Sequence, residues 1–125
     1  MKSTLIGKLL VFVAVCSLSQ FAFADTESAI KSVAGILTNL NHFASDADKA
    51  TLMAISEDES NGRGIRAVAT AVHNIQHAAT ADDKEIMGTV LASDRAQAGV
   101  KSLAGIVAEF NHMVSDEAKA TLGSL

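Results

Sequence analysis

The sequence predicts an all-α fold made of three tandem helical-hairpin repeats, which form a small helical bundle or a short right-handed array. Three observations support this prediction: a repeat with a period of 35 residues, an apolar helical stripe in each copy, and an Ala-rich composition without Pro, Trp or Tyr. Strand-rich domains usually need aromatic residues and Pro/Gly turns, whereas Ala favours helices that pack closely.

The repeat emerges when the chain is shifted by 35 residues. Residues 30–52, "IKSVAGILTNLNHFASDADKATL", share 13 of 23 positions with residues 100–122, "VKSLAGIVAEFNHMVSDEAKATL". A middle copy at residues 65–87, "IRAVATAVHNIQHAATADDKEIM", shares 8 of 23 with the first and keeps its His and Lys. Periods of this length are typical of helical hairpins. We expect a single domain over residues 25–125, with repeat units at about 26–57, 64–92 and 94–125.

Each copy opens with apolar residues at i, i+3, i+7, i+10 and i+14, which place one apolar face on a helix. All fifteen positions are apolar: Ile30, Val33, Leu37, Leu40, Ala44, Ile65, Val68, Val72, Ile75, Ala79, Val100, Leu103, Val107, Phe110 and Val114. The stripe therefore predicts one long helix at the start of each unit.

A second helix start follows in each copy, at "SDAD", "TADD" and "SDEA". A Ser or Thr oxygen accepts hydrogen bonds from the free amides of a first turn, and the following acidic residues suit the helix dipole. Each unit is therefore expected to turn a sharp corner between its two helices. The residues predicted to have a structural role in these three corners are His42, Ser45, Asp46, His77, Thr80, His112, Ser115 and Asp116. The expected helices are 26–44, 46–55, 64–79, 81–92, 94–114 and 116–123.

The first 24 residues are typical of a secretory signal peptide. Lys2 and Lys8 precede the apolar run "LLVFVAVCSL", and Ala22 and Ala24 occupy small-residue positions that predict cleavage before Asp25. Cys16 raises a lipoprotein alternative, although "VAVC" lacks the small residue that precedes a lipidated Cys. The signal looks bacterial and predicts a periplasmic or secreted protein.

The predicted mature chain has 8 basic and 14 acidic residues, a formal charge of −6. This acidic balance argues against nucleic acid and anionic lipid as partners, and we expect no membrane insertion after signal cleavage. The mature chain has no Cys and no Gly-x-Ser-x-Gly motif. We therefore expect no enzyme and no catalytic residues.

Two histidine patterns are candidate metal sites. His42, His77 and His112 recur with the repeat, but in the last turns of stacked helices 8–10 Å apart they should lie too far apart to share a metal. His73 and His77 are four residues apart, a spacing at which one helix face can offer two imidazoles to Zn, Ni or Cu. Asp82 or Asp83 could add a third ligand.

Two glycine features have structural interpretations. The loop "SEDESNGRG" resembles a calcium loop, but Val68 stands where a bidentate Glu is needed, so we expect a solvated loop. Gly35 and Gly105 lie inside expected helices, where Gly is costly, and predict close helix–helix approach.

The favoured functional hypothesis is a non-enzymatic, exported repeat protein that binds another protein and has no cofactor. A homodimer through an exposed end of the repeat array is an option. The alternative is a periplasmic metal-binding protein that uses His73 and His77.

Overall fold

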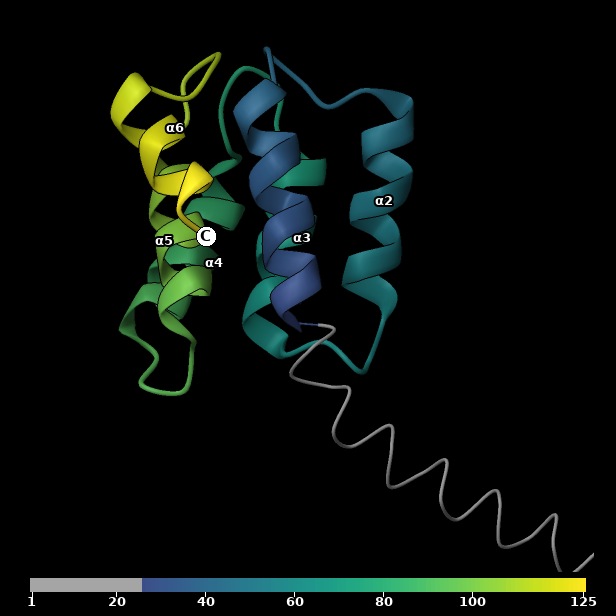
Figure 1. Ribbon diagram of the computed structural model, residues 1–125, viewed down its shortest axis with the longest axis vertical. Coiled ribbons are helices and arrows are strands. Elements are labelled where there is room, and N and C mark those ends of the chain that lie inside the picture. Colours follow the sequence, from purple (N-terminus) through teal and green to yellow (C-terminus); the bar gives the residue numbers. More distant parts are fainter. Residues whose placement is uncertain (1–25) are drawn as a thin grey trace, which may run out of the picture.

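The computed structural model describes residues 26–125, which form six helices and no strands. The predicted signal peptide lies outside the described residues. An all-α fold is confirmed, and Figure 1 shows the helices packed side by side as a small bundle. The helices are the first helix (residues 26–39), α2 (Asp46–Glu57), α3 (Arg63–His73), α4 (Ala81–Ala92), α5 (Ala98–Glu109) and α6 (Asp116–Gly123).

The apolar stripes form the centre of the core, and all fifteen stripe positions are buried. The first helix of each unit is shorter than predicted, since these helices end at residues 39, 73 and 109 rather than 44, 79 and 114. The predicted alternation of long and short helices is wrong, because α3 with 11 residues is no longer than α2 and α4 with 12 each. The last two stripe positions of each copy leave the helix and fold back over its end as part of the corner. Periodic burial therefore continues past the point where helical backbone stops. The N-terminus of α5 is at Ala98 rather than at residue 94, because residues 94–97 are not helical.

The second helix of each unit, α2, α4 or α6, begins at a capping residue in the corner. The hydroxyl of Ser45 accepts a hydrogen bond from the backbone N–H of Asp48 at 3.2 Å, which satisfies a free amide of α2. The same bond joins Thr80 with Asp83 in α4 and Ser115 with Ala118 in α6, each at 3.1 Å.

The units close on one another instead of forming an open array. α2 packs against α3, α4 packs against α5, and α3 contacts α5. The third unit also meets the first, because the backbone N–H of His42 donates to the carbonyl of His112. In an open array the first and third of three units would not touch, so the structure is a closed bundle. The option of dimer formation through an exposed end loses its basis, since it assumed an open array.

The expected close approach at Gly35 and Gly105 is wrong. No atom lies within 4 Å of the point where a Cβ of Gly35 would stand, and Gly105 has only an ordinary contact at 3.9 Å. The close approach occurs instead at Gly64, whose added Cβ would lie 2.9 Å from Cγ1 of Val100. Gly99 occupies the equivalent position of the third unit, where an added Cβ would lie 3.4 Å from Cγ2 of Ile30.

All three corners lie at one end of the bundle, the upper end in Figure 1, and the connections 58–62 and 93–97 lie at the other. None of the helices within residues 26–125 combines the length and the apolar character needed to cross a membrane.

Candidate metal centre

Each corner contains a histidine with an unusual backbone conformation. His42, His77 and His112 have φ values of 68°, 68° and 66°, and they are the only non-glycine residues with positive φ among the described residues. In the first and third corners the residue after the His donates its N–H to the carbonyl of the residue before it, at 2.8 and 2.7 Å. These bonds define γ-turns with a positive φ at the centre, a rare and strained turn type. Backbone strain of this kind concentrates at functional sites, where the surrounding structure maintains it.

A closed cycle of backbone hydrogen bonds joins the three histidines. The N–H of His42 donates to the carbonyl of His112 at 2.7 Å, that of His77 to the carbonyl of His42 at 2.7 Å, and that of His112 to the carbonyl of His77 at 2.5 Å. Each unit thus gives one hydrogen bond to a neighbouring unit and receives one from the other. The arrangement has approximate threefold symmetry about an axis that passes between the three corners.

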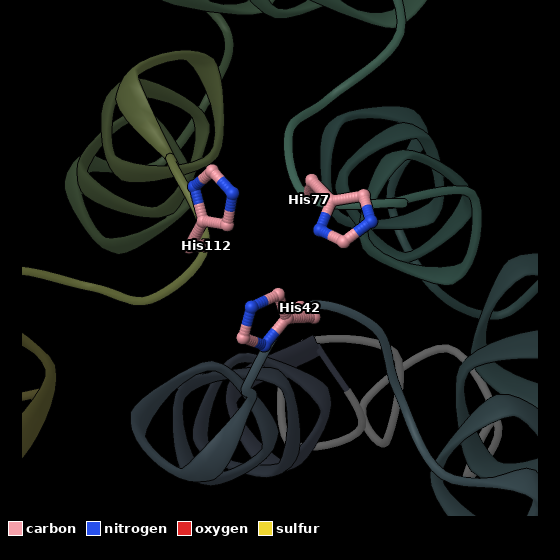
Figure 2. A group of neighbouring side chains, drawn as sticks. All are labelled: His42, His77 and His112. Carbon is pink, nitrogen blue, oxygen red and sulfur yellow. The ribbon is translucent and has the colours of Figure 1, made fainter.

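The three imidazoles gather around this axis, as Figure 2 shows. The ring centroid of His42 lies 5.1 Å from those of His77 and His112, and the latter two are 5.2 Å apart. Each ring offers a nitrogen, and these nitrogens all lie within 4.8 Å of one another. The expectation that the histidines stand too far apart to share a metal is therefore wrong. It placed them on stacked helices, whereas they lie beyond the helix ends, where the chain turns toward the common axis.

One histidine also has a partner that orients its ring. Nδ1 of His112 lies 2.6 Å from Oδ1 of Asn111. When the Asn111 oxygen accepts the Nδ1 hydrogen, Nε2 of His112 retains its lone pair for a metal. Metal-binding histidines typically have such a partner on the second ring nitrogen, because it fixes the tautomer and the orientation.

The predicted pair of His73 and His77 does not have the geometry on which its prediction rests. α3 ends at His73, and His77 lies in the corner, so the two residues do not share a helix face. Nδ1 of His73 lies 3.3 Å from Oδ1 of Asn74 instead. Asp83, one of the two suggested third ligands, is buried and accepts hydrogen bonds from the Thr80 hydroxyl at 2.9 Å and from the Asn74 amide at 3.2 Å.

Acidic and apolar residues surround the three histidines. The first turns of α2, α4 and α6, which start at the same end of the bundle, each carry two acidic residues: Asp46, Asp48, Asp82, Asp83, Asp116 and Glu117. Phe43 and Met113, which directly follow two of the histidines, are 59% and 54% exposed. His42 is half-buried, while His77 and His112 are exposed, so solvent reaches the site.

The sequence contains a signal for this site in the dipeptides Asn41-His42, Gln76-His77 and Asn111-His112. An amide residue precedes the histidine in every copy, as expected for a ligand with an amide partner. The convergence of the three copies, however, depends on closure of the bundle.

No protein-family model matches the chain, and no significant match was found among curated proteins or among solved structures.

Proposed function

We propose that this is an exported protein that binds a divalent transition metal through His42, His77 and His112. The observation that carries the proposal is that three ring nitrogens, one from each unit, lie within 4.8 Å of one another. Three imidazoles are a typical ligand set for Zn²⁺, and they also suit Cu²⁺ and Ni²⁺.

The positions of the rings fit tetrahedral coordination. With Zn–N bonds of about 2.05 Å, tetrahedral geometry places ligand nitrogens about 3.3 Å apart and ring centroids about 5.2 Å apart. The observed centroid separations of 5.1 to 5.2 Å already match this arrangement. The ring nitrogens, which lie within 4.8 Å of one another, would have to approach to about 3.3 Å on binding, and rotation of the side chains is the means we propose. The strained corners hold the rings near the axis and so lower the entropic cost of binding.

Local charge favours a cation at this end of the bundle. Two acidic residues in each first turn of α2, α4 and α6 outnumber the single Lys that follows them in each helix, at Lys49, Lys84 and Lys119. Such a field raises the local concentration of cations and speeds their association. Three protein ligands leave a fourth position of the metal open to water or to an external ligand.

Metal titration of the tag-free protein tests the proposal. Isothermal calorimetry with Zn²⁺, Cu²⁺ and Ni²⁺ should detect one ion per chain, with a Kd of about 1 μM or below for at least one metal. Replacement of any one of the three histidines by Asn should weaken binding by at least about tenfold. Asn is chosen because it tolerates positive φ better than most residues do.

His73→Asn is the matched control, because it also removes one imidazole but leaves the three corners intact. This variant should bind metal as the wild type does. If His73→Asn and His77→Asn lose binding while His42→Asn keeps it, the metal uses the His73 and His77 pair and the proposed site is wrong. The absence of binding by the wild-type protein would reject metal binding altogether.

Binding of another protein is a second candidate function. It is supported by Phe43 and Met113, two large apolar side chains that are mostly exposed at the corner end of the bundle. Side chains of this kind mark protein contact sites when they lie close together on a surface. A pull-down from periplasmic extract should then recover a partner that is lost with the double variant Phe43→Ser/Met113→Ser. A partner retained by this variant would locate the contact elsewhere.

A further inference from the structure

A cavity lies at the end of the bundle opposite the histidines. Its volume is about 840 Å³, and it lies where α3 and α5 begin, with α4 along one side. Organic ligands typically occupy cavities of about 300 to 1,000 Å³. The cavity is independent of the proposed metal site, because α3 and α5 run from the cavity to the corners.

The two helices that begin at this cavity lack the caps of the other helices. The N-cap residues of α3 and α5 are Gly62 and Gln97, and neither makes a side-chain capping bond. Neither helix has an acidic residue in its first turn, whereas α2, α4 and α6 each have two. Both uncapped N-termini line the cavity and give it partial positive charge from two helix dipoles.

Formal charges in the cavity have the same sign. Arg63 and Arg95 line it, and no Asp or Glu among residues 26–125 does. This lining contrasts with a chain of net charge −4, in which acidic residues outnumber basic ones. Helix N-termini and arginines together are the usual means by which proteins bind carboxylates and phosphates.

The remaining walls are mainly apolar and include one unpaired polar group. Ile65, Ile86, Val90 and Val100 contribute apolar surface. Asn61 also lines the cavity and is 7% exposed; its amide nitrogen donates to the carbonyl of Ile55 at 3.2 Å, but its Oδ1 has no hydrogen-bond partner. An unpaired buried oxygen is costly, and a donor group on a ligand would satisfy it.

We propose that this cavity binds an amphipathic anion, with a carboxylate or phosphate head between the N-termini of α3 and α5 and an apolar body against α4. Arg63 and Arg95 neutralise the head, and the free amides of the two first turns donate hydrogen bonds to it. Ile86 and Val90 contact the apolar body.

Displacement of the anionic fluorophore 8-anilinonaphthalene-1-sulfonate tests the proposal on the full protein. Octanoate, octyl phosphate and neutral octanol are compared as competitors at low and high salt. Octanoate or octyl phosphate should displace the dye at concentrations at least about tenfold lower than octanol does, and added salt should reduce the difference. The ranking of the two anions then distinguishes a carboxylate ligand from a phosphate ligand.

Single variants assign the binding to this cavity. Arg63→Gln and Arg95→Gln should each weaken the better anion by about fivefold or more, while Lys84→Gln, which removes an exposed cation at the corner end, should not. Circular dichroism checks that the variants remain folded. The proposal is wrong if octanol competes as well as the anions do, or if neither anion binds. It is also wrong if the Arg63→Gln and Arg95→Gln proteins each bind the anion with the same affinity as the Lys84→Gln protein. The metal-binding variants His42→Asn and His112→Asn should bind the anion normally.

Discussion

A methyl group added to Gly64 in α3 would lie 2.9 Å from Cγ1 of Val100 in α5, closer than side-chain carbons approach one another in folded proteins. The two helices therefore converge at the end of the bundle that faces away from the histidines. Val100 is buried and β-branched, so it has little freedom to move aside. This contact sets the distance between the second and third units.

The first prediction concerns the glycines. Gly64→Ala should lower the free energy of unfolding by about 1 to 3 kcal/mol through overpacking. Gly35→Ala and Gly88→Ala should raise it by up to about 1 kcal/mol, because these helical positions face open space and Ala is the better helix former. Urea unfolding of the three variants measures the values. A stabilising Gly64→Ala would show that α3 and α5 are farther apart than described.

The second prediction uses the positive φ of His77. Gly is favoured over Ala at positive φ by about 1 to 2 kcal/mol, whereas Ala is favoured over Gly by about 1 kcal/mol inside a helix. Metal-free His77→Gly should therefore be more stable than metal-free His77→Ala. The opposite order would place His77 in a helix, as the sequence alone predicts. At His73, the last residue of α3, the preference for Gly should be absent.

The third prediction couples metal binding to stability. A metal that binds only the folded chain stabilises it by about 2.7 kcal/mol at a free concentration 100 times Kd. For a domain of this size, the melting temperature should then rise by about 10 °C or more. Calorimetric scans with and without Zn²⁺ should show this rise in the wild type and in His73→Asn, and a rise of about half that size or less in His112→Asn. An equal rise in all three proteins would mean that the metal binds outside the corners.

A hydrogen-exchange measurement extends this prediction. Metal should slow exchange of the His42, His77 and His112 amides, because those amides form the cycle that joins the units. Protection that is confined to one corner would argue against a shared ion.

The fourth prediction concerns pH and the loop between α2 and α3. The hydroxyl and the backbone N–H of Ser60 donate to the Asp58 carboxylate and, against a smaller opposing effect of desolvation, lower its pKa, with a further contribution from the Arg66 charge. A group whose pKa is lower in the folded state contributes stability above its unfolded pKa and loses that contribution as pH falls through the folded value. Asp58→Asn should therefore be less stable than the wild type at pH 7, and the difference should shrink in acid.

Urea unfolding at a series of pH values between 7 and 2 measures this difference. Ser60→Ala removes the largest cause of the pKa shift but keeps the backbone N–H of residue 60 and the Arg66 charge, so it should show a smaller loss at neutral pH that also disappears in acid. A difference between wild type and Asp58→Asn that stays constant with pH would contradict the assignment.

Local features of the fold could be predicted from the sequence, because each depends on residues close together in the chain. The fifteen stripe positions, from Ile30 to Val114, are all buried as predicted, although the core also contains residues outside the stripe, and Ser45, Thr80 and Ser115 marked the starts of three helices. The end of the first helix in each unit could not be predicted. Leu40 and Ala44 are apolar residues that can be buried either in a continued helix or in a corner that folds back over the helix end. Tertiary contacts with the other two units decide between these conformations.

The candidate site depends on closure, which a repeat does not reveal. A period of 35 residues is compatible with an open array, where His42 and His112 would lie far apart, and with a closed bundle, where they meet. The difference lies in contacts between the first and third units, such as that between Ile30 and Gly99. A sequence pattern that repeats along the chain carries no information on whether its last copy reaches its first.

The hydrogen-bond cycle at the three histidines has a consequence for assembly. Each unit presents a donor surface to one neighbour and an acceptor surface to the other, which is the head-to-tail interface of a cyclic trimer. The peptide links at residues 58–62 and 93–97 take no part in this cycle. Residues 58–62 and 93–97 thus join in one chain three units that meet as the subunits of a C3 trimer do, with one imidazole from each unit beside the axis.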